Sequence, residues 1–303
     1  MKNVAFHNLG CKVNSYELDY VRQILQEKGY NVVPFEEKAD IYIINTCTVT
    51  NIADRKSRQM LHRARALNPR ALVVAMGCYV QAGQEEALRD ACIDLAIGNN
   101  RKKDVVRILE EYLESESLRT EPMCRKTLDG STVIDIGHTR EYEEMQLKQS
   151  AEHTRAYVKI QDGCNQFCSY CVIPYARGRV RSRFREDVLR EVRGMAAAGY
   201  REVVLTGIHI SSYGIEGLIG LMEKIQEIEG VDRIRLGSLE PRIINPDTAK
   251  RLARLPKLCP HFHLSLQSGC DETLRRMNRH YTVREYYASV ENLRREFEDP
   301  AIT

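Results

Sequence analysis

The chain has 303 residues, of which 43% are hydrophobic and 29% are charged, and its formal net charge is +3. This composition is typical of globular chains of about two domains, and it excludes collagen-like, low-complexity and wholly disordered proteins. The net charge is too small to indicate nucleic-acid binding by itself. Because no apolar run is long enough for a transmembrane helix and no signal segment follows Met1, we expect a cytoplasmic protein that does not contact membranes.

Residues 1–113 alternate between short apolar runs and amphipathic stretches, a pattern that predicts a β-α-β domain. The predicted strands are Val4–Phe6, Ile41–Ile44 and Leu72–Met76. One predicted helix begins at an Asn14 cap, and two further helices are predicted at 52–67 and 101–113. The strands are apolar throughout, as in sheets covered on both faces. We therefore predict an α/β fold with a doubly wound parallel sheet as the N-terminal domain.

Residues 114–153 are polar and charged with little periodicity, and we expect a linker there. From residue 154 to residue 303 the alternation resumes with longer units. The predicted strands are Tyr157–Ile160, Val203–Leu205, Ile234–Leu236 and Phe262–Leu266. Four β-α units do not close a barrel, so the second domain is predicted to be a partial β/α barrel. The sequence stops where another strand should begin, and we expect it to be a piece of a longer protein.

Three cysteines, Cys164, Cys168 and Cys171, follow the first strand of the barrel-like half with the spacing C-x3-C-x2-C. A structural zinc site takes four protein ligands, and no histidine lies close by in the sequence. Three thiolates on a 4Fe–4S cluster leave one iron open, and the short loop lets all three reach one cluster. The alternative is a zinc site with a distant fourth ligand.

Three further cysteines, Cys11, Cys47 and Cys78, each lie just past the end of a predicted parallel strand. Strand ends of a parallel sheet share one edge, where ligands bind, so these cysteines can converge on a second cluster. The alternative is three unrelated buried cysteines. Outside the two trios, we expect small buried apolar residues at Cys92, Cys124 and Cys259.

Five arginines occupy every second position from Arg177 to Arg185. In an extended segment they would line one face, which is either solvated and paired with carboxylates or in contact with nucleic acid. Polar groups also follow the later strands, at positions where barrel enzymes bind ligands. They predict one pocket beside the C-x3-C-x2-C loop and include Thr206, Gly207, Ser238, Glu240 and Gln267.

The C-x3-C-x2-C motif, with the aromatic Tyr170 before its last cysteine, resembles the radical S-adenosylmethionine superfamily. Further segments resemble the methylthiotransferase family within it, namely Leu9–Ser15, Asn45–Val49, Met76–Tyr79, Cys171–Gly178, Leu205–Ile210 and Leu264–Gly269. Of these, Leu9–Ser15 and Leu205–Ile210 are most similar to the branch that acts on threonylcarbamoyladenosine next to a tRNA anticodon.

The resemblance implies an enzyme with two 4Fe–4S clusters and S-adenosylmethionine as cofactors. The catalytic metal ligands would be Cys164, Cys168 and Cys171 for the radical cluster and Cys11, Cys47 and Cys78 for the auxiliary, sulfur-carrying cluster. The residues expected to bind S-adenosylmethionine are Tyr170, Thr206, Gly207, Ser238, Glu240 and Gln267. The cofactor is cleaved to a 5′-deoxyadenosyl radical, and a methylthio group passes to carbon 2 of the adenine. The implied partners are tRNA and an electron donor.

Sibling branches of the family modify isopentenyladenosine in tRNA or an aspartate of a ribosomal protein. A radical enzyme that uses its second cluster for electron transfer alone is another alternative. An alternative from a different class is a non-enzymatic, metal-stabilised RNA-binding module. Family members also continue the barrel by two units and add a C-terminal RNA-binding β-domain, and neither is present in this sequence.

Overall fold

The computed structural model describes residues 1–117, 132–149 and 154–303, and it divides into two compact units. Unit 1 consists of Met1–Met145 and Tyr175–Gly178, and unit 2 of Gln146–Pro174 and Arg179–Thr303. Cys124 and part of the expected linker at 114–153 lie outside the described residues. None of the described helices combines the length and apolarity needed to cross a bilayer.

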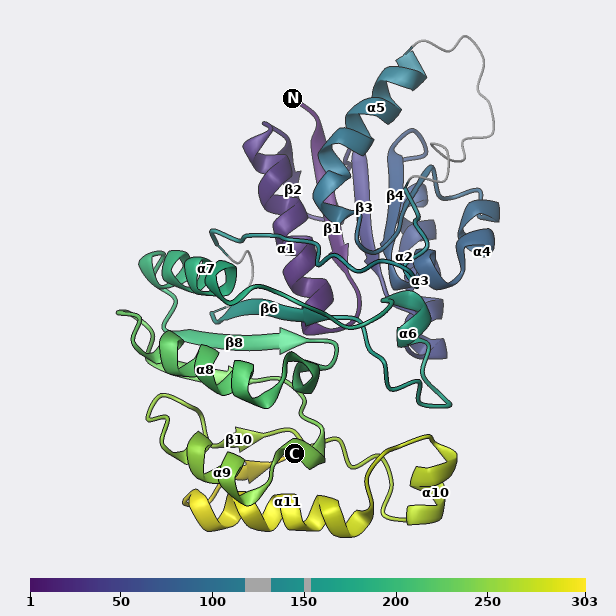
Figure 1. The fold of residues 1–303 in the computed structure, drawn as a ribbon. Coiled ribbons are helices and arrows are strands. Elements are labelled where there is room, and N and C mark those ends of the chain that lie inside the picture. The colour runs from purple at the N-terminus through teal and green to yellow at the C-terminus, as the bar shows by residue number, and fades with distance from the viewer. Residues whose placement is uncertain (118–131, 150–153) are drawn as a thin grey trace. The chain divides into compact units, whose positions relative to one another are not determined.

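Unit 1 contains a five-stranded parallel sheet in the order β2-β1-β3-β4-β5 (Figure 1). Its strands are β1 (Asn3–Asn8), β2 (Asn31–Val33), β3 (Ile41–Thr46), β4 (Leu72–Gly77) and β5 (Leu95–Ile97). Its helices are α1 (Lys12–Glu27), α2 (Asn51–Leu67), α3 (Cys78–Ala82), α4 (Gln84–Arg89) and α5 (Val105–Ser117), which follows the 3-10 turn Lys102–Asp104.

Both faces of this sheet are covered by helices. Ile41 and Ile43 point to one face and pack with α1 and α5, whereas Tyr42 and Ile44 point to the other and pack with α2, α3 and α4. A strand that is buried on both faces needs apolar residues at every position, which is why β3 and β4 read as continuous apolar runs. The predicted doubly wound parallel sheet is confirmed.

Unit 2 contains the parallel strands β6, β8 and β9, with the short β7 antiparallel to β6. Strands β6 and β8 are labelled in Figure 1. Two further strands, β10 and β11, pair in parallel. The strands are β6 (Ala156–Asp162), β7 (Arg181–Ser182), β8 (Glu202–Gly207), β9 (Arg233–Leu236), β10 (His261–Phe262) and β11 (Ala301–Ile302). The helices are α6 (Ile173–Ala176), α7 (Arg185–Ala197), α8 (Ile215–Gln226), α9 (Pro246–Ala253), α10 (Asp271–Arg276) and α11 (Val283–Glu296), with 3-10 turns at Ile210–Tyr213 and Pro241–Ile243.

Isolated parallel bridges join Ile234 to Leu258 and Leu239 to Leu264, so the strand succession continues from β9 toward β10. Helices α7, α8, α9 and α11 contribute to one apolar cluster with the strands. The partial β/α barrel predicted from the sequence is confirmed. The last predicted strand is shorter than expected, since β10 covers only His261–Phe262 and the Ser265 and Leu266 carbonyls face the Tyr281 hydroxyl instead of a neighbouring strand.

Candidate functional site

Cys11, Cys47 and Cys78 lie at the carboxyl ends of three neighbouring strands of unit 1. Cys11 precedes the first turn of α1, Cys47 directly follows β3, and Cys78 directly follows β4 as the first residue of α3. Because β1, β3 and β4 are adjacent, these strand ends meet at one edge of the sheet. Cys47 and Cys78 are buried, whereas Cys11 is exposed. The structure thus brings the trio to one edge, open to solvent at Cys11.

Two glycines let the backbone pass close to this trio. Gly10 has φ +109°, and a Cβ atom there would lie 3.1 Å from the Cys47 Sγ. Gly77 has φ +101° and ψ −151°, a region that is essentially restricted to glycine, and a Cβ atom there would lie 2.7 Å from Asn45 Oδ1. Any other residue at Gly10 would crowd the sulfur itself, so the glycine keeps the space around Cys47 clear.

Asn14 is not the cap of the first helix, because α1 already begins at Lys12 with Cys11 as its N-cap. The Asn14 side chain is buried and its Nδ2 donates to the carbonyls of Leu9 (2.7 Å) and Thr46 (3.0 Å). Asn14 therefore ties α1 to the loops that carry Cys11 and Cys47, a role that the capping pattern did not indicate.

Burial raises the pKa of the Cys47 thiol, an effect that a main-chain hydrogen bond at Val49 opposes and that the neighbouring Cys78 and Cys11 reinforce. Cys78 and Cys11 are thus both near enough to Cys47 to act on its thiol. A thiol must lose its proton to become a metal ligand, so a metal bound by these cysteines would displace their protons.

Cys164, Cys168 and Cys171 lie in the loop that follows β6 in unit 2. The Asn278 side chain donates to the carbonyls of Gln166 (3.1 Å) and Phe167 (3.0 Å), which anchors the loop next to the end of α10. Burial also raises the pKa of the Cys164 and Cys171 thiols. The loop is therefore held by unit 2 itself.

A cavity of about 200 Å³ opens beside this loop. It contains four of the six residues that the sequence predicts for S-adenosylmethionine, namely Tyr170, Ser238, Glu240 and Gln267, together with the three cysteines. Thr206 and Gly207 are not among its lining residues. At the end of β8, Thr206 is buried and Gly207 packs so closely on β6 that a Cβ atom would lie 2.9 Å from the Gln161 carbonyl.

Glu240 is an anion held inside this cavity. Burial alone would raise its pKa, but interactions with His209 and Arg242 outweigh burial and lower the pKa to about 2. Arg242 Nε donates to Oε1 over 2.7 Å, and Gln166 Nε2 donates to Oε2 over 3.2 Å. His209 Nε2 lies 3.5 Å from the same Oε2. The cavity therefore offers a fixed negative charge.

Arg279 supplies a positive charge to the same cavity, and sequence analysis did not identify it. Its Nη1 donates to Cys168 Sγ over 3.2 Å, and its guanidinium lies 5.0 Å from the centre of the Tyr281 ring. Burial opposes the charge of Arg279, but the contacts with Cys168 and Tyr281 raise its pKa above the ordinary value. Gln166 and His209, which also line the cavity, were missed because neither has a recognisable ligand spacing.

The arginine run does not form one solvated face. Arg177, Arg181 and Arg183 are buried, and the other two arginines of the run are exposed. Arg183 pairs with the buried Glu191, and Arg181 lies 3.7 Å from the Asp162 carboxylate. The interpretation of the run as a single nucleic-acid-binding or solvent-facing row is therefore wrong, because three of the five arginines turn inward to buried carboxylates.

Neither cysteine trio is gathered as tightly as a single zinc ion requires. Tetrahedral zinc with Zn–S bonds of about 2.3 Å brings its sulfurs to about 4 Å from one another. Within the described residues, the donors of only one trio, His62, Asp90 and Cys92, all lie within 4.8 Å of one another. The sulfurs of each cysteine trio therefore do not all lie within 4.8 Å of one another.

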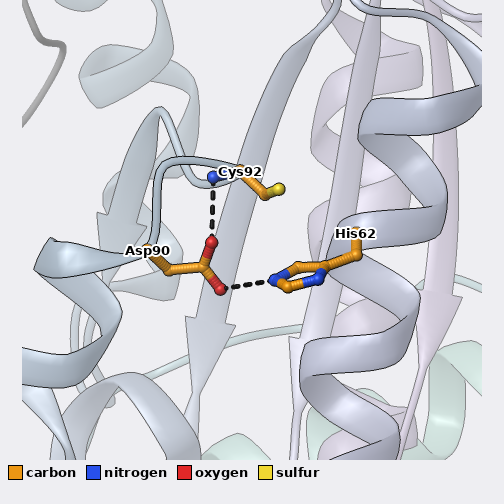
Figure 2. Close-up of side chains that lie close together, drawn as sticks. All are labelled: His62, Asp90 and Cys92. Atoms are coloured by element: carbon orange, nitrogen blue, oxygen red, sulfur yellow. Dashed lines mark hydrogen bonds and ion pairs between the residues drawn. The ribbon is translucent and has the colours of Figure 1, made fainter.

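The His62–Asp90–Cys92 group connects α2 to the segment after α4 (Figure 2). Asp90 accepts from the Cys92 N–H through Oδ1 (2.9 Å) and lies 2.9 Å from His62 Nε2 through Oδ2. Hydrogen bonds within the group thus account for its spacing. Cys92 is only half-buried, so the expectation of a buried residue is wrong there, whereas Cys259 is buried as expected.

Comparisons with known proteins match the two parts of the chain to different family models. Residues 3–98 match the "Uncharacterized protein family UPF0004", and residues 158–303 match the "Radical SAM superfamily". Among solved structures, the radical S-adenosylmethionine methyltransferase TsrM from Kitasatospora setae has a TM-score of 0.68 at 16% identity, over 97% of this chain and 67% of that chain. OxsB, a cobalamin-dependent S-adenosylmethionine radical enzyme, has a TM-score of 0.61 at 12% identity, over 97% of this chain and 48% of that chain. The fold is that of a radical S-adenosylmethionine enzyme.

Curated relatives define the family more closely. Threonylcarbamoyladenosine tRNA methylthiotransferase MtaB is 42% identical in Aquifex aeolicus, over 93% of this chain and 67% of the relative. The Bacillus subtilis protein of the same name is 38% identical, over 100% of this chain and 66% of the relative. The chain belongs to this family of radical S-adenosylmethionine methylthiotransferases and spans about two thirds of the length of these relatives. Enzymes of the family use S-adenosylmethionine and carry two 4Fe–4S clusters.

Proposed function

We propose that the protein transfers a methylthio group to carbon 2 of N6-threonylcarbamoyladenosine next to the anticodon of tRNA. The observation that carries the proposal is the presence of two cysteine trios, one at strand ends of unit 1 and one beside the cavity of unit 2. Relatives with the corresponding name are 34–42% identical. The proposed substrate places the reaction in the cytoplasm, with an electron donor as the second partner.

In this proposal Cys164, Cys168 and Cys171 hold the radical cluster, which supplies the electron that cleaves S-adenosylmethionine, and Cys11, Cys47 and Cys78 hold the auxiliary cluster, which supplies the sulfur. The donor sets fit, because each trio offers three thiols to a cluster and leaves one iron for another ligand. The glycine at position 10 keeps the space beside Cys47 clear for such a cluster.

The residues of the unit 2 cavity bind and orient S-adenosylmethionine. The carboxylate of Glu240 offers a fixed acceptor and a negative charge to the cationic cofactor, and Arg279 offers a positive charge to its carboxylate. Tyr170 lines the same cavity and presents an aromatic surface to the adenine. Together these groups place the sulfonium beside the cysteine loop and limit the access of water.

A second candidate function is methylthiolation of dimethylallyladenosine in tRNA. The observation that favours it is a relative from Moorella thermoacetica, named tRNA-2-methylthio-N(6)-dimethylallyladenosine synthase, which is 32% identical over 97% of this chain and 66% of the relative. We prefer the threonylcarbamoyl substrate because the relatives that carry that name are more similar to this chain.

Mass analysis of tRNA nucleosides tests both candidates. A bacterial strain that lacks both tRNA methylthiotransferases receives the full-length gene, and its tRNA is digested and separated. We expect the methylthio form of threonylcarbamoyladenosine to appear, and to be absent with Cys164→Ala but present with the control Cys259→Ala. Appearance of methylthio-dimethylallyladenosine instead would assign the second function, and absence of both products would contradict the proposal.

A further inference from the structure

Arg177 has a fully buried guanidinium and belongs to unit 1, although in the sequence it follows the cysteine loop 164–171 of unit 2. The segment Tyr175–Gly178 packs as part of unit 1. There, Arg177 Nε donates to the Cys78 sulfur over 3.4 Å. A guanidinium keeps its proton in proteins, so a permanent positive charge lies next to Cys78.

The orientation of this guanidinium is set by its other contacts. Arg177 Nη2 donates to Glu17 Oε2 over 3.0 Å and also to Asn14 Oδ1, and Nη1 donates to Glu17 Oε1. Both partners lie on α1, whose first turn begins next to Cys11. Because the fork of the guanidinium is engaged by Glu17 and Asn14, Nε is left directed at Cys78.

Asn99 is a second donor to the same sulfur. Its Nδ2 lies 3.6 Å from Cys78 Sγ and donates to the Ala176 carbonyl over 2.6 Å. The residue that precedes Arg177 is thereby anchored by the side chain that also faces Cys78. Cys78 thus receives two side-chain N–H donors, from two segments far apart in the sequence.

We propose that Arg177 is a positioning residue that raises the reduction potential of the cluster held by Cys11, Cys47 and Cys78. The inference rests on the proposed function, because it takes these cysteines as cluster ligands. Hydrogen bonds to ligand sulfurs and nearby positive charge stabilise the additional electron of a reduced cluster. The loop that leaves Cys171 therefore delivers, six residues later, the charge that makes the auxiliary cluster easier to reduce.

The test isolates the auxiliary cluster. The parent variant carries Cys164→Ala, Cys168→Ala and Cys171→Ala. After anaerobic reconstitution it should contain about four iron and four sulfide per chain, because one 4Fe–4S cluster remains. If this parent variant holds no cluster, the ligand assignment of the proposed function fails and the inference falls with it. If it holds the cluster, the effect of Arg177 is tested separately.

Redox titration followed by electron paramagnetic resonance then compares Arg177→Gln with the parent. We expect the midpoint potential to become more negative, with unchanged iron content. The matched control is Arg185→Gln, which removes an exposed arginine eight residues further on and should leave the potential unchanged. An unchanged potential in Arg177→Gln would overturn the inference.

Arg177→Lys is the second variant and decides the outcome if Arg177→Gln does not fold. Lysine keeps the charge next to Glu17 but lacks the planar fork that directs Nε at Cys78. Because the charge is kept and only the Nε–H donor to Cys78 is lost, we expect a more negative potential in Arg177→Lys but a smaller shift than full removal of the guanidinium would give. A potential that does not become more negative in Arg177→Lys overturns the inference. Loss of iron from both variants with unchanged circular dichroism would show a role in cluster retention alone, and would also overturn it.

Discussion

Lys102 forms an ion pair with Glu17, a residue 85 positions earlier in the chain, and both side chains are excluded from solvent. Burial lowers the pKa of Lys102, while the carboxylate of Glu17 and the sulfur of Cys78 oppose that lowering. Glu17 also binds Arg177, so one buried carboxylate serves two cations. Glu17 thus links Lys102 to the Arg177 guanidinium, which contacts Cys78.

Removing the shared carboxylate should be far more damaging than removing one of its cations. Glu17→Gln leaves Lys102 and Arg177 buried without their anion, and we expect the free energy of unfolding to fall by about 3–5 kcal/mol. Lys102→Met leaves Glu17 paired with Arg177, and we expect less than half of that loss. Urea denaturation of the two variants measures the difference.

An exposed pair provides the control for this comparison. Lys224 and Glu227 lie 3.0 Å apart with more than half of each side chain exposed, and Glu227→Gln should change the unfolding free energy by less than about 1 kcal/mol. Equal losses for Glu17→Gln and Lys102→Met would contradict the arrangement described here.

Gly77 should not tolerate a side chain, because alanine there combines backbone strain with a close contact. Its φ and ψ lie in a region that is essentially restricted to glycine, and the added Cβ would meet Asn45 Oδ1 at 2.7 Å. We expect Gly77→Ala to lower the unfolding free energy by about 3 kcal/mol or more.

Gly29 is the matched control, since it has φ +86° and no atom within 4 Å of an added Cβ. Gly29→Ala carries the strain alone, and we expect a loss of about 1 kcal/mol. Thermal unfolding of both variants measures the difference. Similar losses at the two positions would show that the close contact with Asn45 has no energetic effect.

Much of the fold was predictable, because parallel strands buried on both faces leave apolar runs that are easy to recognise. The strand-end positions of Cys11, Cys47 and Cys78 followed from the same pattern. The inward turn of Arg177 was not predictable, because alternating charges usually mark an exposed face and its partner Glu17 is 160 residues away. Residues such as this one are placed by tertiary contacts that no local spacing records.

Iron content tests the division of the cysteines between two sites. We expect about eight iron per reconstituted chain, and about four after Cys11→Ala, Cys47→Ala and Cys78→Ala are combined. The half that remains should still cleave S-adenosylmethionine under dithionite, measured as 5′-deoxyadenosine. Cys92→Ala and Cys259→Ala should retain the full iron content. Loss of all iron from the triple variant would show that the two trios do not bind clusters independently.

Glu240 should make the stability of the protein depend on pH in the acid range. Its pKa in the folded protein is about 2, against an ordinary value of 4.5. A carboxyl group with a lowered pKa stabilises the fold fully above its ordinary pKa, and this contribution is lost as the pH falls toward the folded value. The shift corresponds to a contribution of roughly 3 kcal/mol at neutral pH.

The measurement is the difference in unfolding free energy between the wild type and Glu240→Gln at two pH values. We expect the advantage of the wild type to shrink by about 1 kcal/mol between pH 7 and pH 3.5. The control Glu229→Gln removes an exposed carboxylate, and its difference from the wild type should stay constant over that range. Because Arg242 and His209 hold the Glu240 carboxylate ionised, a pH-independent difference for Glu240→Gln would show that these contacts do not stabilise the anion.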